Sequence, residues 1–191
     1  MKSTSNKQQL LESLYKPYIG CNGCHFNMPK ATQLVWGEGN IDSPILFIGE
    51  APGKDEDIQG KPFVGRSGKL LNKILENLGS ARNNVFITNI VKCRPPNNRR
   101  PLAQEIEISR PLLYAQIDIL KPRIICTLGS AALEGLLDEQ IKITKRRGTP
   151  ISWRNLTIIP AYHPAYILRN PKELQTLTDD IGTAIKLSHQ K

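Results

Sequence analysis

The stretch PILFIGEAPG, residues 44 to 53, decides the fold class of this 191-residue chain. Its apolar half is short and continuous, as is typical of a buried strand, and its second half is a loop bracketed by Gly49 and Gly53. Three more apolar runs follow, at residues 84–91, 123–129 and 156–162. Each run therefore predicts a strand of the same sheet.

Segments of helical character flank these runs, at residues 6–15, 69–79, 105–120, 130–138 and 171–188. Pro111 is expected to break or restart the helix over 105–120, and TPISW (149–153) to form a small hairpin arm. Strands that alternate with helices predict an α/β fold with a mostly parallel sheet covered on both faces.

Length and composition favour one domain spanning residues 1–191, since a single core grows to ~250 residues before it splits. No apolar stretch approaches the ~20 residues of a membrane span, and the polar N-terminus does not resemble a signal peptide. We therefore expect a soluble cytoplasmic protein with no membrane partner. Thiols stay reduced in that compartment, so four irregularly spaced cysteines favour metal binding or redox use over disulfides.

Charge points to a polyanionic partner. Lysine and arginine outnumber carboxylates 26 to 17, which gives a formal net charge of +9. The basic residues cluster within 92–100 and 145–147. In KCRPPNNRRP (92–101), a stiff loop presents Arg94, Arg99 and Arg100, an arrangement suited to phosphate contacts.

The segments that follow the predicted strands carry the chemistry. In a parallel sheet the binding site lies at the carboxyl ends of the strands. These ends carry GEAPG (49–53), Asn89, Gly129 with Ser130, and Tyr162 with His163 and Pro164. The motif-like residues are therefore expected to meet at one edge of the sheet.

Taken singly, these residues leave alternatives open. GEAPGK (49–54) is one residue short of a phosphate-binding P-loop and has Asp55 where a hydroxyl should bind magnesium, so nucleotide hydrolysis is not expected. Backbone N–H groups of the same turn suit a developing anion, or the segment is an ordinary strand-to-loop turn, which the segment alone favours. Asn89 has the donor and acceptor needed to recognise a nucleobase edge, or it caps a turn. His163 is either catalytic or structural.

In order along nearly the whole chain, several segments together resemble the family 4 uracil-DNA glycosylases, the iron–sulfur type of bacteria and archaea. The segments are VWGEGN (35–40), ILFIGEAPGKDEDIQGKPFVGRSGKLLNKILENLG (45–79), NVFITNIVKCRPPNNRRP (84–101), KPRIICTLG (121–129), ITKRRG (143–148) and AYHPAYILRNP (161–171). The resemblance implies a three-layer α/β/α sandwich with a central four-stranded, mostly parallel sheet. It also implies a monofunctional glycosylase that flips uracil out of DNA and leaves an abasic site in base excision repair.

By the same resemblance, Phe63 stacks on uracil, Asn89 bonds its polar edge, and Glu56 lies near C5 and excludes thymine's methyl group. Glu50 and Ala51 belong to the catalytic turn beneath the base. Ala51 stands where related families place a water-orienting aspartate, which leaves Glu50 as a candidate for that task. His163 donates a hydrogen bond to uracil O2 as negative charge develops there.

AYILR (165–169) resembles the loop that enters the minor groove of DNA. It offers Tyr166, Ile167 or Leu168 as the wedge that fills the gap left by the flipped base, and Arg169 as a phosphate contact. Alternatively, this segment is the buried start of the last helix. Uracil-containing DNA, single- or double-stranded, is the expected partner of a monomeric, nucleoid-associated enzyme.

The resemblance further implies a structural [4Fe–4S] cluster. Cys21, Cys24 and Cys93 match three of its ligands, but the fourth position holds Ser109, which either binds iron, leaves it to water or His25, or caps the restarted helix. A cluster with three thiolates is expected to be labile. Cys126 lies in an apolar strand and is expected to be a small buried residue instead.

Two other functions remain open from the sequence. The first is a catalytically weak uracil- or abasic-DNA-binding or crosslinking protein of the same superfamily. That branch carries an extra basic, histidine-containing insert, whereas GKPFVGRSGKLL (60–71) runs straight into a helix. The second is a redox or iron sensor that uses the sandwich only as a scaffold.

Overall fold

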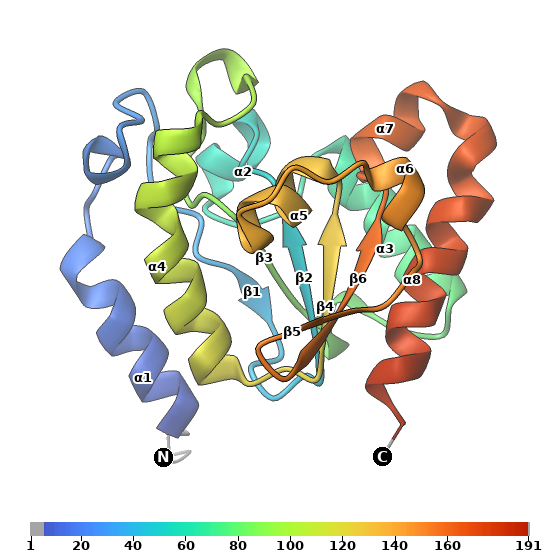
Figure 1. The fold of residues 1–191 in the computed structure, drawn as a ribbon. Coiled ribbons are helices and arrows are strands. Elements are labelled where there is room, and N and C mark those ends of the chain that lie inside the picture. The colour runs from blue at the N-terminus through green and yellow to red at the C-terminus, as the bar shows by residue number, and fades with distance from the viewer. Residues whose placement is uncertain (1–5, 191) are drawn as a thin grey trace.

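A central sheet organises the chain in the computed structural model, which describes residues 6–190 (Figure 1). The strand order is β1-β3-β2-β4-β6-β5, and the strands are β1 Glu38–Gly39, β2 Ile45–Gly49, β3 Phe86–Asn89, β4 Ile124–Leu128, β5 Ile151–Trp153 and β6 Leu156–Ala161. The four inner strands, β3, β2, β4 and β6, all pair in parallel. The expected parallel core of four strands is confirmed.

Two short antiparallel strands extend the sheet at its edges, so the described sheet has six strands rather than four. β5 is the expected hairpin arm, and it joins β6 through a turn in which Arg154 and Asn155 have positive φ. β1 was not expected, because two residues are too few to show a period of two along the sequence.

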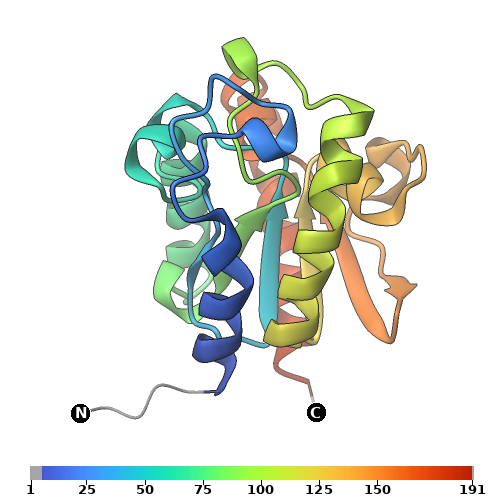
Figure 2. The same cartoon turned by 90° about the vertical axis from the view of Figure 1, so that its left-hand side faces the viewer.

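Helices cover both faces of the sheet, as Figures 1 and 2 show. The α-helices are α1 Asn6–Tyr15, α2 Lys54–Gln59, α3 Arg66–Asn77, α4 Ala103–Leu120, α5 Ser130–Leu137, α6 Ile143–Arg146, α7 Pro164–Arg169 and α8 Leu174–Ser188. Short 3₁₀ turns are η1 Lys16–Tyr18, η2 Cys24–Phe26, η3 Arg82–Asn84, η4 Pro96–Asn98 and η5 Pro171–Glu173. The predicted α/β/α sandwich is confirmed.

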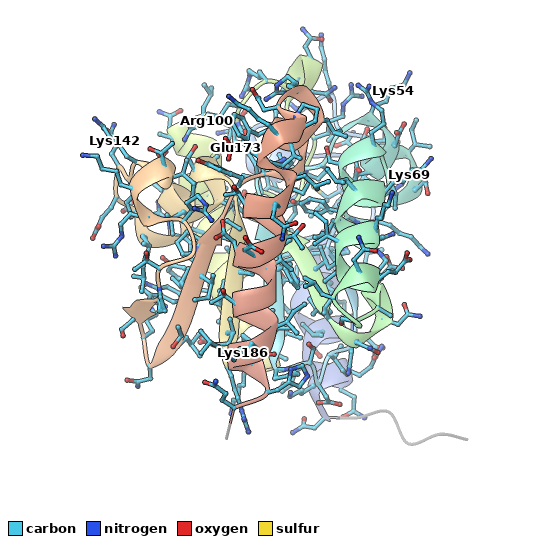
Figure 3. All side chains as sticks on the ribbon, turned by 90° about the vertical axis from the view of Figure 1, so that its right-hand side faces the viewer. Lys54, Lys69, Arg100, Lys142, Glu173 and Lys186 are labelled. Atoms are coloured by element: carbon cyan, nitrogen blue, oxygen red, sulfur yellow. The ribbon has the colours of Figure 1, made fainter. Side chains whose placement is uncertain are left out.

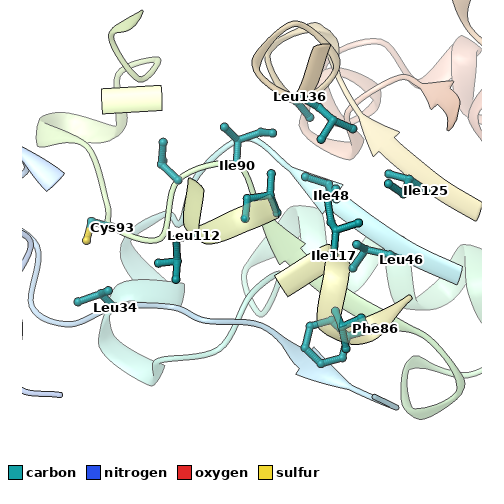
Figure 4. Close-up of a cluster of buried hydrophobic side chains, with 14 of the residues drawn as sticks. Leu34, Leu46, Ile48, Phe86, Ile90, Cys93, Leu112, Ile117, Ile125 and Leu136 are labelled. Carbon is teal, nitrogen blue, oxygen red and sulfur yellow. The ribbon is translucent and has the colours of Figure 1, made fainter. Parts of the chain in front are cut away.

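Successive side chains of each strand point to opposite faces of the sheet, so the apolar residues form two separate cores. Leu46 and Ile48 of β2 face a core built with α1, α4 and α5, part of which is drawn in Figure 4. Ile45 and Phe47 face the opposite core, built with α3, α7 and α8. Because β2 is buried on both faces, its sequence is a continuous apolar run.

Pro111 does not break or restart a helix, and that expectation was wrong. α4 runs through it from Ala103 to Leu120, with buried residues on both sides, including Ser109, Leu112 and Leu113. Proline removes one backbone donor from a helix interior, but the packing of the flanking turns against the sheet maintains the helix. Ser109 is therefore an interior residue and not a cap. No helix within residues 6–190 is long and apolar enough to cross a membrane.

Candidate active site

A cavity of about 490 Å³ opens at the carboxyl ends of the parallel strands. Its walls come from the segments that follow β2, β3 and β6, as the strand-end argument predicts. The lining residues are Glu50, Ala51, Pro52, Gly53, Glu56, Phe63, Ser67, Asn89, Pro95, Asn98, Arg99, His163, Ala165, Tyr166 and Arg169. All six residues predicted to contact the base or to act in catalysis therefore meet in one place.

The floor of the cavity requires a glycine. A Cβ placed on Gly49, the last residue of β2, would lie 2.5 Å from Asn89 Oδ1 and 2.5 Å from the ring of Phe63. Both distances are far below van der Waals contact. Gly49 therefore lets Asn89 and Phe63 approach the end of β2 closely.

Asn89 presents an unpaired amide to the cavity. The residue ends β3 with 1% of its surface exposed, and neither its Nδ2 nor its Oδ1 has a hydrogen-bond partner. Buried polar groups are almost always paired, because an unmade bond costs ~1–3 kcal/mol. Among the described residues, the Asn89 amide thus leaves both its NH2 group and its oxygen unpaired, and it does not cap a turn.

The backbone of Asn89 is held from behind by a buried lysine. Lys92 Nζ donates to the Asn89 carbonyl at 2.8 Å and to Thr88 Oγ1 at 2.6 Å. Burial away from water lowers the pKa of Lys92 well below its ordinary value.

Phe63 has an unusual backbone conformation for a bulky residue, with φ of +51°. The carboxylate of Glu56 accepts the next two N–H groups, from Val64 at 2.9 Å and Gly65 at 2.8 Å, and that of Gly53 at 3.1 Å. Glu56 lines the cavity as predicted, and it also fixes the loop that carries Phe63.

His163 offers one ring nitrogen to the cavity. Its Nδ1 accepts the backbone N–H of Ala165 at 3.0 Å and so caps α7. The proton of the neutral ring therefore lies on Nε2, which is left to donate. Burial, and secondly the positive charge of Arg169, lower the pKa of His163 to about 4. The ring is neutral across the physiological range.

Glu50 and Ala51 follow β2 directly and line the same cavity. Burial raises the pKa of the Glu50 carboxyl; Arg100 opposes this shift and Glu134 adds to it. Ala51 packs against the apolar core on the side of α4 and α5. Glu50 is thus the one cavity carboxyl, beside the immobilised Glu56, among the described residues.

The segment after His163 forms the short helix α7, separate from α8. Ile167 is buried in the core, whereas Tyr166 and Leu168 are exposed on the surface. Ile167 is therefore removed from the set of wedge candidates. Tyr166 and Arg169 line the cavity.

Contacts within the protein hold the three arginines of the basic loop (92–101), which the sequence did not indicate. Arg99 forms a two-pronged ion pair with buried Glu105, at 2.6 and 2.7 Å, and Arg100 pairs with Glu134. Arg94 donates to Asn98 Oδ1 at 2.7 Å. Figure 3 places Lys54, Arg100 and Lys142 toward the cavity end of the molecule and Lys186 toward the opposite end.

The predicted cluster ligands come from the segments around η2, Cys93 and α4. Cys93 is buried, and Cys21 Sγ lies 3.3 Å from His25 Nδ1. The side chain of Cys24 lies outside the described residues. Among those described, no group of three or more His, Cys, Asp or Glu side chains could hold a metal ion.

The environment of Ser109 bears on the fourth ligand of the implied cluster. It is fully buried, and its hydroxyl has no hydrogen-bond partner among the described residues. Its helix α4 packs against η2, which contains Cys24. A buried hydroxyl without a partner, on a helix that packs against this region, fits a ligand role. Cys126 lies buried in β4, where burial, with a smaller effect of Asp180, raises the pKa of its thiol, so the expectation of a small buried residue is confirmed.

Sequence reasoning missed Ser67, Pro95, Asn98 and Arg82. The first three line the cavity from loops and a helix start, where no periodicity marks them. Arg82 lies outside the cavity but donates to the carbonyls of Pro62 and Phe63. Its surroundings, SARNNV, resemble an ordinary polar turn, and no local signal would have found it.

Comparison with known proteins identifies the family of the chain. A sequence model of the Uracil DNA glycosylase superfamily matches residues 36–182. The chain is 44% identical over 166 residues to a Type-4 uracil-DNA glycosylase of Thermotoga maritima, covering 86% of each chain. It is 47% identical to one of Saccharolobus solfataricus (76% of this chain, 72% of the relative) and 38% identical to one of Archaeoglobus fulgidus (95% and 94%).

The chain therefore belongs to the uracil-DNA glycosylase superfamily, and within it to the type-4 family.

Proposed function

We propose that this chain is a monofunctional uracil-DNA glycosylase that hydrolyses the N-glycosidic bond of a uracil flipped out of DNA and leaves an abasic site. Its family membership supports the activity. The observation that carries the site assignment is the buried, unpaired amide of Asn89 in a cavity shared with Phe63 and His163. An amide with a free donor and a free acceptor matches the O4 and N3–H edge of uracil.

Binding must offset the cost of flipping, which is a few kcal/mol. Stacking on Phe63 and the two hydrogen bonds of Asn89 supply this energy. Cytosine presents a donor where uracil presents O4 and an acceptor at N3, so it would require the Asn89 amide in the opposite orientation. A 5-methyl group would meet Glu56, whose carboxylate cannot swing aside because three backbone N–H groups hold it.

The reaction breaks the bond between C1′ and the base nitrogen, and the bonding electrons leave with uracil. His163 donates a hydrogen bond from Nε2–H to the uracil oxygen that gains charge and keeps its proton, so a neutral ring suffices. A preorganised donor of this kind is worth ~3–4 kcal/mol. Water then adds to C1′ and loses one proton, and the uracil anion takes up one proton, which gives free uracil and an abasic sugar.

Glu50 is the residue we assign to the water and to the positive charge on the sugar. Its carboxyl lines the cavity beside Ala51, which is too small to orient water itself. None of the described residues that line the cavity is a lysine, and Lys92 is fully buried behind Asn89. This arrangement supports hydrolysis by water without a Schiff-base intermediate.

DNA would lie across the carboxyl ends of the strands. Tyr166 or Leu168 of α7 fills the gap left by the flipped base, and Arg169 contacts a phosphate. Arg94 contributes to contacts with the DNA backbone. Arg99 and Arg100 contribute only through the guanidinium N–H groups that are not bound to Glu105 and Glu134. The enzyme acts as a single-domain monomer at the nucleoid.

A [4Fe–4S] cluster would be held by Cys21, Cys24 and Cys93, with Ser109 as the fourth ligand. The group would tie the N-terminal segment to the loop after β3 and to α4, a structural task remote from the base. Buried Ser109, with its unpartnered hydroxyl, supports this assignment.

The test is release of free uracil from oligonucleotides carrying U·G, U·A or single-stranded U, with T·G as control, in EDTA and without ATP. We expect free uracil together with an alkali-labile abasic site, and no thymine. Binding without release, or an SDS-resistant protein–DNA adduct in place of the abasic product, would overturn the proposal.

A further inference from the structure

We propose that Arg82 is a positioning residue that holds Phe63 in the conformation needed to stack on the flipped base, an inference that rests on the proposed function. Arg82 begins η3 and lies outside the cavity. It acts on the base only through the loop that carries Phe63.

Arg82 spreads its guanidinium over that loop. Nη1 donates to the Phe63 carbonyl at 3.2 Å, and Nη2 donates to the Pro62 carbonyl. Nη1 also lies 3.3 Å from Asn72 Oδ1 on α3. With 19% of its side chain exposed, Arg82 is largely sheltered from the water that would weaken these bonds.

The loop needs such support because Phe63 has φ of +51°, a region that bulky residues rarely occupy. Its carbonyl is also crowded: a Cβ on Gly68 would lie 1.8 Å from Phe63 O. The two carbonyls at Pro62 and Phe63 bind Arg82, and the two following N–H groups bind Glu56. Phe63 is thus fixed from both sides along the chain.

An ion pair anchors Arg82 itself. Glu38 Oε2 of β1 accepts from Nε at 3.2 Å and from Nη2 at 2.9 Å, while Lys61 binds the other carboxylate oxygen at 3.2 Å. A guanidinium can serve a carboxylate and two carbonyls at once because its five donors lie in one plane. A lysine at this position would keep the positive charge but would lose the planar set of N–H donors.

The test compares uracil release and inhibition by free uracil for the wild type, Arg82→Met and Arg82→Lys. We expect both variants to lose about 10- to 100-fold in kcat/KM, because small misplacement of a binding group has effects of this order. The inhibition constant for free uracil should rise in both. A near-normal Arg82→Lys would show that charge alone matters and would contradict the proposal.

A double-mutant cycle with Phe63→Ala tests whether the loss in kcat/KM caused by Arg82→Met arises through Phe63. If Arg82 acts through Phe63, adding Arg82→Met to Phe63→Ala lowers kcat/KM by no more than about twofold. Full additivity of the two losses would overturn the proposal, since it would show that Arg82 acts elsewhere.

Arg110→Met is the matched control. Arg110 has 18% of its side chain exposed and likewise combines a carboxylate partner, Asp138, with a backbone carbonyl, that of Gly135, but it does not line the cavity. We expect uracil inhibition unchanged in this variant, and a rise equal to that of Arg82→Met would assign the effect to general destabilisation.

If Arg82→Met does not fold, Glu38→Gln takes its place, because it weakens the ion pair of Arg82 without removing the guanidinium. We expect a smaller loss in kcat/KM, and we expect that loss to disappear in the Phe63→Ala background. A loss that persists in that background would contradict the proposal. Failure of the wild type to release uracil would instead refute the proposed function.

Discussion

The rings of His163 and Phe63 lie 5.7 Å apart between centroids, with an angle of 29° between their planes. One residue follows β6 and the other follows α2, so the relationship exists only in the folded chain. It places the predicted stacking surface beside the predicted hydrogen-bond donor. A base stacked on Phe63 is thereby brought within the neighbourhood of His163 Nε2.

The pH dependence of cleavage should carry no step at the ordinary histidine pKa. The pKa of His163 is lowered to about 4, so the ring is neutral above that pH and is protonated only as the pH falls through about 4. Protonation would place an N–H at Nδ1 against the Ala165 N–H and break the cap. We therefore expect that titration of His163 does not lower the single-turnover rate of uracil release between pH 8 and pH 5.5.

A rate step near pH 6.5 that vanishes in His163→Gln would contradict this assignment. Linkage gives a second check. Because the unfolded state binds a proton at higher pH than the folded state does, the contribution of His163 to the free energy of unfolding declines as the pH falls from 6.5 toward 4.

Asn89→Ala should separate stability from function. The Asn89 amide has no partner within the described residues 6–190, so its removal relieves a buried unsatisfied group. The free energy of unfolding should therefore stay unchanged or rise. Uracil release should fall by roughly 10²-fold, since two hydrogen bonds to the base are lost. Urea unfolding and single-turnover release measure the two effects.

Thr127→Val is the control for this pair of effects. Thr127 Oγ1 is likewise buried without a partner, but Thr127 lies within β4 and does not line the cavity. Its removal should leave stability equal or higher and activity unchanged. A strongly destabilised Asn89→Ala with normal uracil inhibition would mean that Asn89 is structural.

Ser109→Cys should increase retention of the proposed cluster in air, because a thiolate is a better iron ligand than an alcohol oxygen. Iron and sulfide per chain, with the decay of visible absorbance on exposure to air, give the readout. Ser109→Ala is the counterpart and should lower retention. Equal retention in all three proteins would remove Ser109 from the ligand set.

Leu168→Ala should lower uracil release from duplex DNA by about 10-fold or more and from single-stranded DNA much less, because only a duplex leaves a stacked gap to fill. Leu174→Ala is the control: Leu174 is exposed to a similar extent, 41% against 43%, but it lies at the start of α8 and not on α7. An equal loss on both substrates would assign Leu168 a role other than the wedge.

The parallel core and the position of the cavity followed from the sequence, because apolar runs that alternate with helices leave few topologies and parallel strands end on one side. Contacts between distant segments did not follow. Nothing in the turn around Arg82 indicates that it reaches Phe63, and the partners of Arg99 and Arg100 stand on helices whose placement depends on the whole fold. Pro111 showed the same limit, since packing overrode a local rule.

His163→Ala tests the central claim most directly, by single-turnover uracil release and by DNA binding measured on the same preparation. We predict that the wild type releases free uracil, and that the variant binds the oligonucleotide with nearly unchanged affinity and releases uracil about 10²- to 10³-fold more slowly. Release by the variant at the wild-type rate, or no release by either protein, would contradict the account.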